Sequence, residues 1–580
     1  MGPGRQGSML QTIRKYWRRL GRDEAGQIFI LFGASVIPIM LLIGGALDVS
    51  RLTRHKMDLA NAIDAAALAL ARKGQHYEVE EAKTFVESYI AALGVESEQF
   101  VVDDIGIEKT QDGFLVSAVG EMETSFLPLG GILTGGASLD AMAVNITAQV
   151  VHSSNRVELA LVFDNTGSMT QYAGSNPCGV GTDRMSGLKC AASLLVDDLM
   201  LELNDGDGDD QLKVALVPFE GAVNVGADPL NPPAWIDWSD QATATYTGIN
   251  VNTKDFGGAI GEARVGHKWL YDKLGIAWAG CVEMRAEPYD LLDTPPDPTN
   301  PATLFVPMFW PDEPDTSSDY WNNYLNDGVS GTGAARQLSL TKYDKASPSG
   351  ISWVSSSRKD TTFPYSYGPN RGCPRPLTPL TSDETTIDNA IAAMQPQGAT
   401  GTFIANGLIW GWHVLSPGEP FTEGLGPDDE YYGKTIKAVV LLTDGANSPS
   451  IAVTGSNNHN ESTYSGYNYP GTEIDHVVGG QHYYRRLQAV NVDSDPSDST
   501  ATSILNSKTS SLCENVRGAG VRLYTITFGS MNATTTNLMT NCASLDEDGS
   551  RLYFAAPDSE ELENIFRAIG RDLSEIHLSM

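Results

Sequence analysis

Residues Val157–Met169, VELALVFDNTGSM, decide the fold of most of the chain. The apolar run LALVF ends at Asp164, and two hydroxyl residues follow at alternate positions, Thr166 and Ser168. A short, unbroken apolar run is typical of a strand buried on both faces. The oxygen-bearing side chains after it are the kind that bind hard cations. We therefore expect a buried strand that ends in a candidate cation site.

The pattern around this strand indicates an α/β fold. Strands are expected at 156–164, 212–219, 436–443, 521–528 and 551–554, and helices at 184–203, 384–394, 403–415, 503–517 and 559–576. This alternation predicts a doubly wound, mostly parallel sheet with helices on both faces. Two stretches depart from it. We interpret residues 226–380, which hold seven of the ten tryptophans, and the polar residues 447–498 as irregular inserts.

Two apolar strands of this pattern end in an aspartate, LVFD at Asp164 and VVLLTD at Asp444. If these strands are parallel neighbours, both carboxylates lie at the same edge of the sheet, where ligands of such sheets bind. A third segment, GATGTFIANGL, supplies Thr400 or Thr402 just before a helix. Hydroxyls and carboxylates, completed by water, suit the octahedral order of Mg²⁺. Such a site has room for one external oxygen, typically a carboxylate from a partner.

The N-terminus has the pattern of a membrane anchor. Residues 28–47 are twenty residues without a charge, which is long enough to span a bilayer as a helix, and Pro38 need not break that helix. The preceding residues 1–27 are rich in basic side chains, so we expect this end in the cytoplasm and the rest outside. The Gly44-x-Ala46 pattern leaves signal-peptide cleavage open.

Residues 48–152 are expected to form a stalk. An Ala-rich amphipathic helix continues to about residue 72, and its apolar face packs either on a partner or on its own domain. A helix at 79–93 and strands at 100–107, 114–119 and 142–151 then indicate a small α+β unit. It contains no cluster of catalytic residue types.

Charge and cysteine usage narrow the class of protein. The formal net charge of −33 argues against nucleic-acid binding through a basic surface. The six cysteines contain no CxxC motif, which argues against zinc. In an exported chain an even number suggests disulfides, and among fifteen possible pairings we expect neighbours in sequence to pair. The expected pairs are Cys178–Cys190, Cys281–Cys373 and Cys513–Cys542.

Other candidate sites have simpler interpretations. The acidic run NDGDGDD, residues 204–210, lacks EF-hand spacing and is interpreted as a solvated turn. His413 has no evident acid or nucleophile partner in the sequence and is interpreted as a packed or surface histidine. Ser168 does not lie in GxSxG, and no cofactor fingerprint is present. We therefore expect a protein that is not an enzyme.

The DNTGSM loop resembles the DxSxS motif of von Willebrand factor A domains, with Thr166 in place of the first serine. Thr402 matches the family's metal-binding threonine by its spacing to the helix, whereas Thr400 does not. LLTDGAN, with Asp444, resembles the family's second aspartate. The resemblance implies that Thr166 and Ser168 ligate the metal directly. It also implies that Thr402 is a direct or switchable ligand, and that Asp164 and Asp444 act directly or through water.

The N-terminal segment AGQIFILFGASVIPIMLLIGGALDVSR resembles TadG-type proteins of the bacterial tight-adherence (Tad, Flp) pilus-assembly system. Phrases such as GCVEMR, GPNRGCPRPLTPL and YTITFG are also similar to that family. Pilin-like members carry a glutamate five residues after a glycine cleavage site. Here Gly26 is followed at that position by Leu31, which favours an uncleaved anchor.

These observations predict a single-pass bacterial inner-membrane protein. Its residues 153–580 form a von Willebrand A-type domain outside the cytoplasm. We expect this domain to bind Mg²⁺ (or Ca²⁺ or Mn²⁺) and, through it, an acidic group on a pilus or assembly component. The first alternative is a structural pilus or scaffold component whose cation only stabilises the fold. The second is a metal-assisted hydrolase. The sequence does not name the partner, the metal in the cell or the oligomer.

Overall fold

The structure of the chain is a computed structural model. It describes residues 24–71, 79–97, 99–110, 113–129, 140–151, 156–204, 211–226, 228, 230–238, 259–260, 263–264, 266–285, 287–313, 322–326, 342–345, 347–359, 361–398, 400–429, 431–449, 463–467, 476–478, 481–483, 498–546 and 548–574. These residues form two compact units, one within residues 1–154 and one within residues 155–575.

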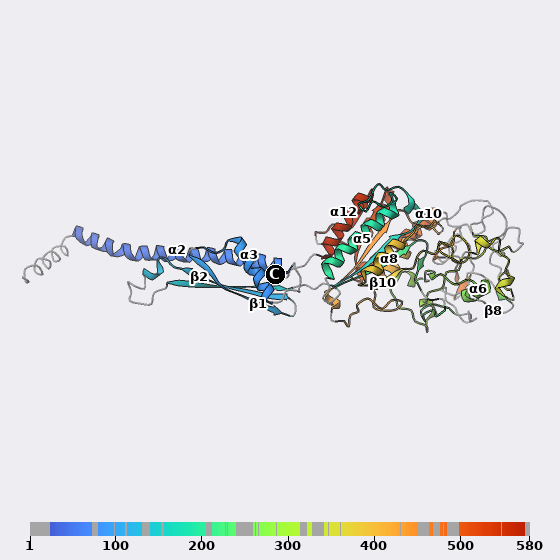
Figure 1. The fold of residues 1–580 in the computed structure, drawn as a ribbon, viewed down its shortest axis with the longest axis horizontal. Coiled ribbons are helices and arrows are strands. Elements are labelled where there is room, and N and C mark those ends of the chain that lie inside the picture. Colours follow the sequence, from blue (N-terminus) through green and yellow to red (C-terminus); the bar gives the residue numbers. More distant parts are fainter. Residues whose placement is uncertain are drawn as a thin grey trace, which may run out of the picture. The chain divides into compact units, whose positions relative to one another are not determined.

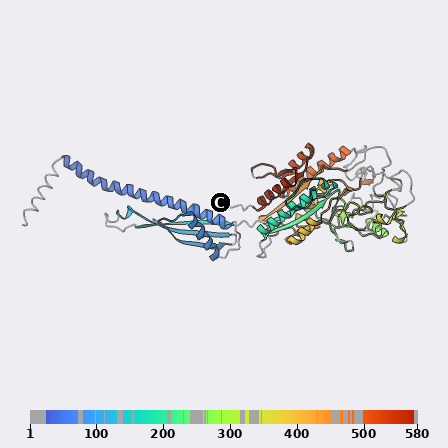
Figure 2. The same ribbon diagram turned by 45° about the horizontal axis from the view of Figure 1, so that its top comes forward.

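The N-terminal unit combines two helices with a three-stranded antiparallel sheet. Its helices are α2 (Glu24–Ala71) and α3 (Val79–Leu93). Its strands, in sheet order, are β1 (Phe100–Thr110), β2 (Gly113–Glu123) and β3 (Ala141–Val151). Helix α2 runs along this sheet in both views (Figure 1 and Figure 2).

The C-terminal half of α2 buries the apolar face that the sequence predicts. Its buried side chains are Leu59, Ala62, Ile63, Ala66, Ala67 and Leu70. They pack against α3 and against strand residues such as Phe100 and Val116. This face therefore packs on its own unit, which decides between the two possibilities that the sequence left open.

The N-terminal half of α2 instead exposes large apolar side chains. They include Leu31, Phe32, Ile39, Met40, Leu42 and Ile43. By length and composition, Leu31–Ala67 is apolar enough to cross a membrane. Pro38 lies inside the helix and does not end it.

Asp48, in helix α2, binds the loop that follows β2 in the same N-terminal unit. Its buried carboxylate accepts hydrogen bonds from the backbone N–H groups of Ser125 (3.3 Å), Phe126 (2.8 Å) and Leu127 (2.9 Å). One turn earlier, a Cβ on Gly44 would lie 2.6 Å from the Phe126 side chain, so only glycine lets the loop approach this closely. The loop is thus held on α2 where its exposed apolar segment ends.

The larger unit is built on a mostly parallel sheet. Its six main strands, in spatial order, are β10 (Thr378–Thr381), β5 (Leu212–Phe219), β4 (Arg156–Asp164), β11 (Thr435–Thr443), β14 (Arg522–Phe528) and β15 (Tyr553–Ala556). Only β10 runs antiparallel to its neighbour among these six. Two short strands, β6 (Val223–Asn224) and β9 (Cys281–Val282), extend the sheet beyond β5. Numbered along the chain, the six strands have the order 3-2-1-4-5-6 of a doubly wound sheet.

Helices cover both faces of this sheet (Figure 1). On one face, α5 (Arg184–Leu203), α8 (Glu384–Ala393) and α12 (Ser559–Ser574) pack over Leu159, Leu161 and Phe163. On the other, α9 (Ile404–Leu415), α10 (Asp498–Gly518) and α11 (Ala533–Cys542) pack over Ala160 and Val162. Because β4 is covered on both sides, its residues from Val157 onward are all buried, as an unbroken apolar run requires.

The described part of the first insert has little regular structure. Its elements include β7 (Ala259–Ile260), β8 (Ala263–Arg264) and α6 (His267–Leu274). Its aromatic residues are mostly internal: Trp235 and Trp278 belong to the same core as α9, and Trp310 is fully buried. The described part of the second insert includes β12 (His476–Val478) and β13 (Gln481–Tyr483).

Helix α11 and strand β10 differ from the sequence prediction. Helix α11 was not predicted, because its sequence ATTTNLMTNC is rich in β-branched threonine; Leu538 and Met539 nevertheless pack into the core. Strand β10 was assigned to the first insert, yet it pairs with β5 as an antiparallel strand.

Three disulfides close the larger unit, and they join the pairs expected from the sequence. Cys178–Cys190 ties the loop after β4 to α5. Cys281–Cys373 joins residues 92 positions apart in the first insert, and Cys513–Cys542 joins α10 to α11. Long closed loops are where cross-links restrict the unfolded chain most.

Candidate metal centre

Asp164 and Asp444 lie at the same edge of the sheet. Strands β4 and β11 are parallel neighbours, with Phe163 opposite Leu442. Asp164 is the last residue of β4, and Asp444 directly follows β11. The two strands are therefore parallel neighbours as expected, and both carboxylates lie at the carboxyl end of the sheet.

The loop after β4 folds its hydroxyls onto the Asp164 carboxylate. Oδ1 accepts hydrogen bonds from the backbone N–H (2.9 Å) and Oγ1 (2.6 Å) of Thr166, and Oδ2 accepts one from Thr443 Oγ1 (2.7 Å). The chain then turns into a short 3₁₀ helix, Gly167–Thr170, which directs Ser168 back toward the same point. Thr166 Oγ1 and Ser168 Oγ lie 3.0 Å apart, and Ser168 Oγ donates to Asp444 Oδ1 at 2.6 Å. Four of the five predicted ligands thus form one continuous hydrogen-bonded chain.

Thr402 approaches this chain from a third loop. Its backbone pairs with Ser448, just after the Asp444 loop, in two hydrogen bonds of 3.2 and 2.9 Å. A Cβ atom added to Gly445 would lie 3.7 Å from Thr402 Oγ1, so this hydroxyl lies close to the residue that follows Asp444. The same loop pairs Gln397 with Thr166, and a Cβ on Gly167 would lie 3.1 Å from the Gly398 backbone. The structure therefore brings together the three segments that contain all five predicted residues.

The two aspartates differ in how they are compensated. Burial, and then the charge of Asp444, raise the pKa of Asp164 to about 6. Asp444 faces a cation: Arg184 Nη1, from the start of α5, donates to its Oδ2 at 2.8 Å. Asp164 is held by hydroxyl and amide donors instead.

These oxygens fit a small divalent cation. In octahedral coordination at the 2.0–2.1 Å typical of Mg²⁺, neighbouring ligand oxygens are about 3 Å apart. The oxygen–oxygen separations along Asp164–Thr166–Ser168–Asp444 are 2.6, 3.0 and 2.6 Å. Hydroxyls and carboxylates are also the donors that hard cations prefer.

Sequence reasoning missed several residues that shape this centre. Arg184 and Thr443 contact its carboxylates, and Glu220 lies at the same edge, bonded to Thr400. Thr443 is the residue before a predicted ligand, so its position was readable once the two strands were paired. Arg184 and Glu220 belong to no ligand motif, and only the packing of α5 and β5 identifies them.

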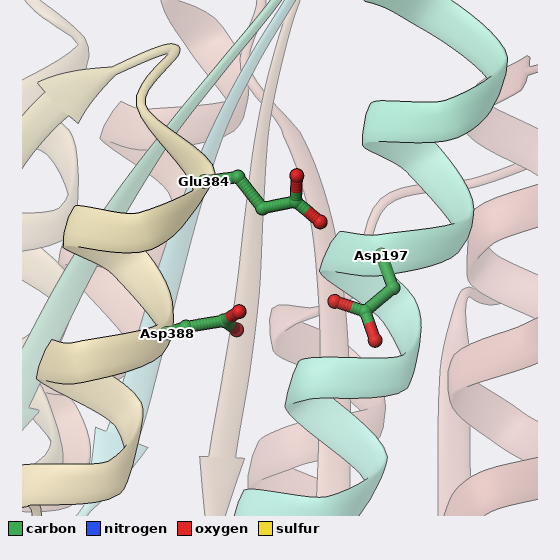
Figure 3. A group of neighbouring side chains, drawn as sticks. All are labelled: Asp197, Glu384 and Asp388. Carbon is green, nitrogen blue, oxygen red and sulfur yellow. The ribbon is translucent and has the colours of Figure 1, made fainter.

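A second acidic group lies away from this edge. Asp197 of α5 faces Glu384 and Asp388 of α8 across the space between the helices (Figure 3), and their carboxylate oxygens lie within 4.8 Å of one another. Burial and the neighbouring Asp388 and Glu384 raise the pKa of Asp197. Asp197 and Glu384 are exposed, and such exposed acidic groups are common without an ion. The acidic residues 205–210 lie outside the described residues.

His413 has partners that the sequence did not reveal. It is buried, its Nδ1 donates to Asp293 Oδ1 at 2.8 Å, and its Nε2 accepts from Arg285 Nη2 at 3.4 Å. This is an internal polar cluster between α9 and the first insert. The interpretation as a packed histidine agrees with this position.

Comparison with protein families places the N-terminal segment. Residues 26–72 match the family described as putative Flp pilus-assembly TadE/G-like. The resemblance of this segment to Tad pilus-assembly proteins is thereby confirmed. No curated protein sequence matches the chain.

Solved structures similar to the chain include pilus proteins. The PilB minor pilin from Streptococcus sanguinis is 13% identical over 82% of this chain and 78% of its own, with a TM-score of 0.30. The vWF domain of the type V pili tip protein Mfa5 from Porphyromonas gingivalis is 11% identical over 73% and 98%, with a TM-score of 0.29. The pilus adhesin RrgA from Streptococcus pneumoniae is 11% identical over 82% and 54%, with a TM-score of 0.31.

Proposed function

We propose that this chain is a membrane-anchored, extracytoplasmic component of Tad/Flp pilus assembly or adhesion. In this proposal residues 28–47 cross the inner membrane, residues 48–152 form a stalk, and residues 153–580 form a von Willebrand A-type domain. That domain binds a divalent cation through Asp164, Thr166, Ser168, Thr402 and Asp444. The match of residues 26–72 to the TadE/G-like family supports the pilus-related role.

One observation carries the cation proposal. Side-chain oxygens from two separate loops, after β4 and after β11, lie within 2.6–3.0 Å of their neighbours at the carboxyl edge of the sheet, and the Thr402 loop pairs with both. When bound there, Mg²⁺, or Ca²⁺ or Mn²⁺, offers an open coordination position to an oxygen of another molecule. The residues of this chain orient that position: Arg184 fixes Asp444, and Thr443 fixes Asp164. The partner is therefore proposed to carry an acidic group, as a pilus or assembly component would.

Calorimetry on the detergent-solubilised full chain tests this proposal. We expect Mg²⁺ binding to the wild-type chain, and its loss in Asp164→Ala and Thr402→Ala. Asp197→Asn removes an exposed acid of the α5–α8 group and serves as the matched control, which retains binding. In cells, the same two alanine variants should lose pilus assembly or adhesion. Intact assembly and adhesion without cation binding would instead favour a purely structural role.

Reporter fusions test the membrane arrangement. A reporter that is active only outside the cytoplasm should be active after residue 580 and inactive at the N-terminus. The basic N-terminal segment and the uncharged residues 28–47 are the reason for this expectation. Activity of the N-terminal fusion would reverse the proposed orientation.

A further inference from the structure

Glu220 is a buried carboxylate at the same edge of the sheet as the candidate metal centre. It directly follows β5 and is fully buried. Its Oε2 accepts a hydrogen bond from Thr400 Oγ1 at 3.1 Å. Its Oε1 is buried and has no hydrogen-bond partner among the described residues. A buried carboxylate with one partner is costly, so its presence needs a reason.

The backbone around Glu220 is tightly held. The N–H of Gly221 donates to Thr400 Oγ1 at 3.0 Å, and its carbonyl accepts from Asn406 Nδ2 at 2.6 Å. A Cβ on Gly221 would lie 2.7 Å from the Thr400 side chain and carbonyl, so this close approach requires glycine. Thr400 precedes the proposed ligand Thr402 by two residues. The position of Glu220 is therefore tied to the loop that contains Thr402.

Glu220 is one residue beyond the sheet partner of Asp164 and is close enough to be affected by the Asp164 charge. Phe219, the residue before Glu220, lies opposite Asp164, and its carbonyl accepts from the Asn165 N–H at 2.8 Å. Asn165 is also fully buried, and its Oδ1 has no partner among the described residues. Two neighbouring strand ends thus each hold a buried oxygen that receives no hydrogen bond from the described residues.

We propose that Glu220 is a third carboxylate of the divalent-cation centre, which adds negative charge from behind the Thr400–Thr402 loop and so strengthens cation binding. The inference rests on the function proposed above. With the cation bound, Asp164, Asp444 and Glu220 would carry three negative charges, and Arg184, which contacts Asp444, carries one positive charge. The net charge of the three carboxylates and Arg184 is then −2, which one divalent cation neutralises. Glu220 acts as a positioning and charge-balancing residue that selects a divalent over a monovalent cation.

The opposing possibility is a permanently neutral Glu220 that only supports Thr400. Glu220→Gln distinguishes the two, because glutamine has the shape of a neutral glutamic acid and carries no charge. If Glu220 serves the cation, Glu220→Gln should weaken Mg²⁺ binding by roughly tenfold or more, since a nearby charge acts strongly on a divalent ion. The cation-free variant should unfold at the same or a higher temperature, because burial raises the pKa of Glu220 well above its ordinary value and so disfavours the charge that the substitution removes. A purely structural residue would not produce that combination.

Calorimetric titration of the full chain with MgCl₂, CaCl₂ and MnCl₂ measures these affinities. Glu220→Asp keeps the charge and should lose less affinity than Glu220→Gln. Thr400→Val removes the hydroxyl that holds Oε2 and should also weaken binding, whereas the control Asp197→Asn should not. If Glu220→Gln does not fold, the Glu220→Asp and Thr400→Val affinities decide the question.

The outcomes separate this inference from the function on which it rests. If the wild type binds the cation and Glu220→Gln binds it with equal affinity, Glu220 has no role in cation binding and the proposed function is unaffected. The same conclusion follows if both Glu220→Asp and Thr400→Val keep the wild-type affinity. A wild-type chain that binds none of the three cations overturns the proposed function itself.

Discussion

The candidate metal centre and the first insert bury carboxylates in different ways. In the insert, Asp290 faces Lys508 at 2.8 Å, and Asp312 faces Lys342 at 3.0 Å, so each of these two buried acids is paired with a cation. At the sheet edge, Asp164, Asp444 and Glu220 are supplied with Arg184 and with hydroxyl donors. Buried charge is tolerated when it is paired. The charges of Asp290 and Asp312 are therefore already paired, whereas the sheet edge has charge that an added cation can neutralise.

The ion pairs also show what the inserts do. Lys508 lies in α10, which covers the sheet of the larger unit, and Asp290 lies in the first insert. Asn515, from the same helix, donates to Leu291 O at 2.8 Å. In the second insert, the N–H of Gly466 donates to Gly221 O at 2.6 Å, beside Glu220. Both inserts are thus attached by polar contacts to the part of the larger unit that contains the sheet.

Breaking a pair in the insert should have the largest effect on stability. Lys508→Met keeps the apolar stem but leaves Asp290, which is 1% exposed, without its buried cation. Loss of one partner of a buried pair typically costs about 3–5 kcal/mol. Urea unfolding should show this loss with and without Mg²⁺. Adding Asp290→Asn should recover much of it, and no recovery would mean that the pair is not the cause.

Removing a carboxylate at the sheet edge should change stability in a way that depends on Mg²⁺, unlike breaking the Lys508–Asp290 pair. Asp164→Asn relieves the repulsion between Asp164 and Asp444, so the cation-free chain should be as stable as the wild type or more stable. At Mg²⁺ concentrations about 100 times Kd, the wild type should gain about 2.7 kcal/mol and the variant nothing. Thermal unfolding with and without MgCl₂ measures both values. If Mg²⁺ does not change the unfolding temperature of the wild type, the sheet edge does not differ from the first insert in this way.

The histidine cluster should make stability depend on pH. Burial lowers the pKa of His413 below its ordinary value of 6.5, and Arg285 opposes its protonation further, although Asp293 favours it. Because the unfolded chain then binds the proton more readily, the stability contributed by His413 is complete above pH 6.5 and is lost as pH falls below it. The slope should reach at most about 1.4 kcal/mol per pH unit. His413→Gln should flatten the unfolding free energy between pH 5 and 7, and an unchanged slope would exclude His413.

Asp48 should show the smallest effect, because the hydrogen bonds that its carboxylate accepts come from backbone amides. Asp48→Ala removes the acceptor of three N–H groups that hold residues 125–127 on α2. By analogy with capping side chains, the loss should be about 1 kcal/mol. Hydrogen exchange of the Phe126 and Leu127 amides should accelerate, while exchange in the larger unit stays unchanged. Equal acceleration in both units would mean that the change is not local.

Local patterns were sufficient for most of the elements. The bounds of α3, α5 and β5 agree with the sequence prediction, because each has a clear apolar period between polar or glycine-containing breaks. The strand ends at Asp164 and Asp444 were also readable, since a charge cannot continue a buried strand. In the DNTGSM loop, the alternate spacing of Thr166 and Ser168 indicated that their hydroxyls could converge on one site.

The tertiary structure decided what those local patterns could not. Whether two strands are neighbours depends on pairing across nearly 280 residues, and this pairing placed Asp164 beside Thr443 and Asp444. Helix α11 forms although its threonines favour other conformations, because packing outweighs propensity. Glu220 stands in a sequence, LVPFEG, that carries no motif. Its burial and its hydrogen bond to Thr400 arise only when β5 and the loop at Thr400 meet, so the sequence alone could not identify it as a candidate.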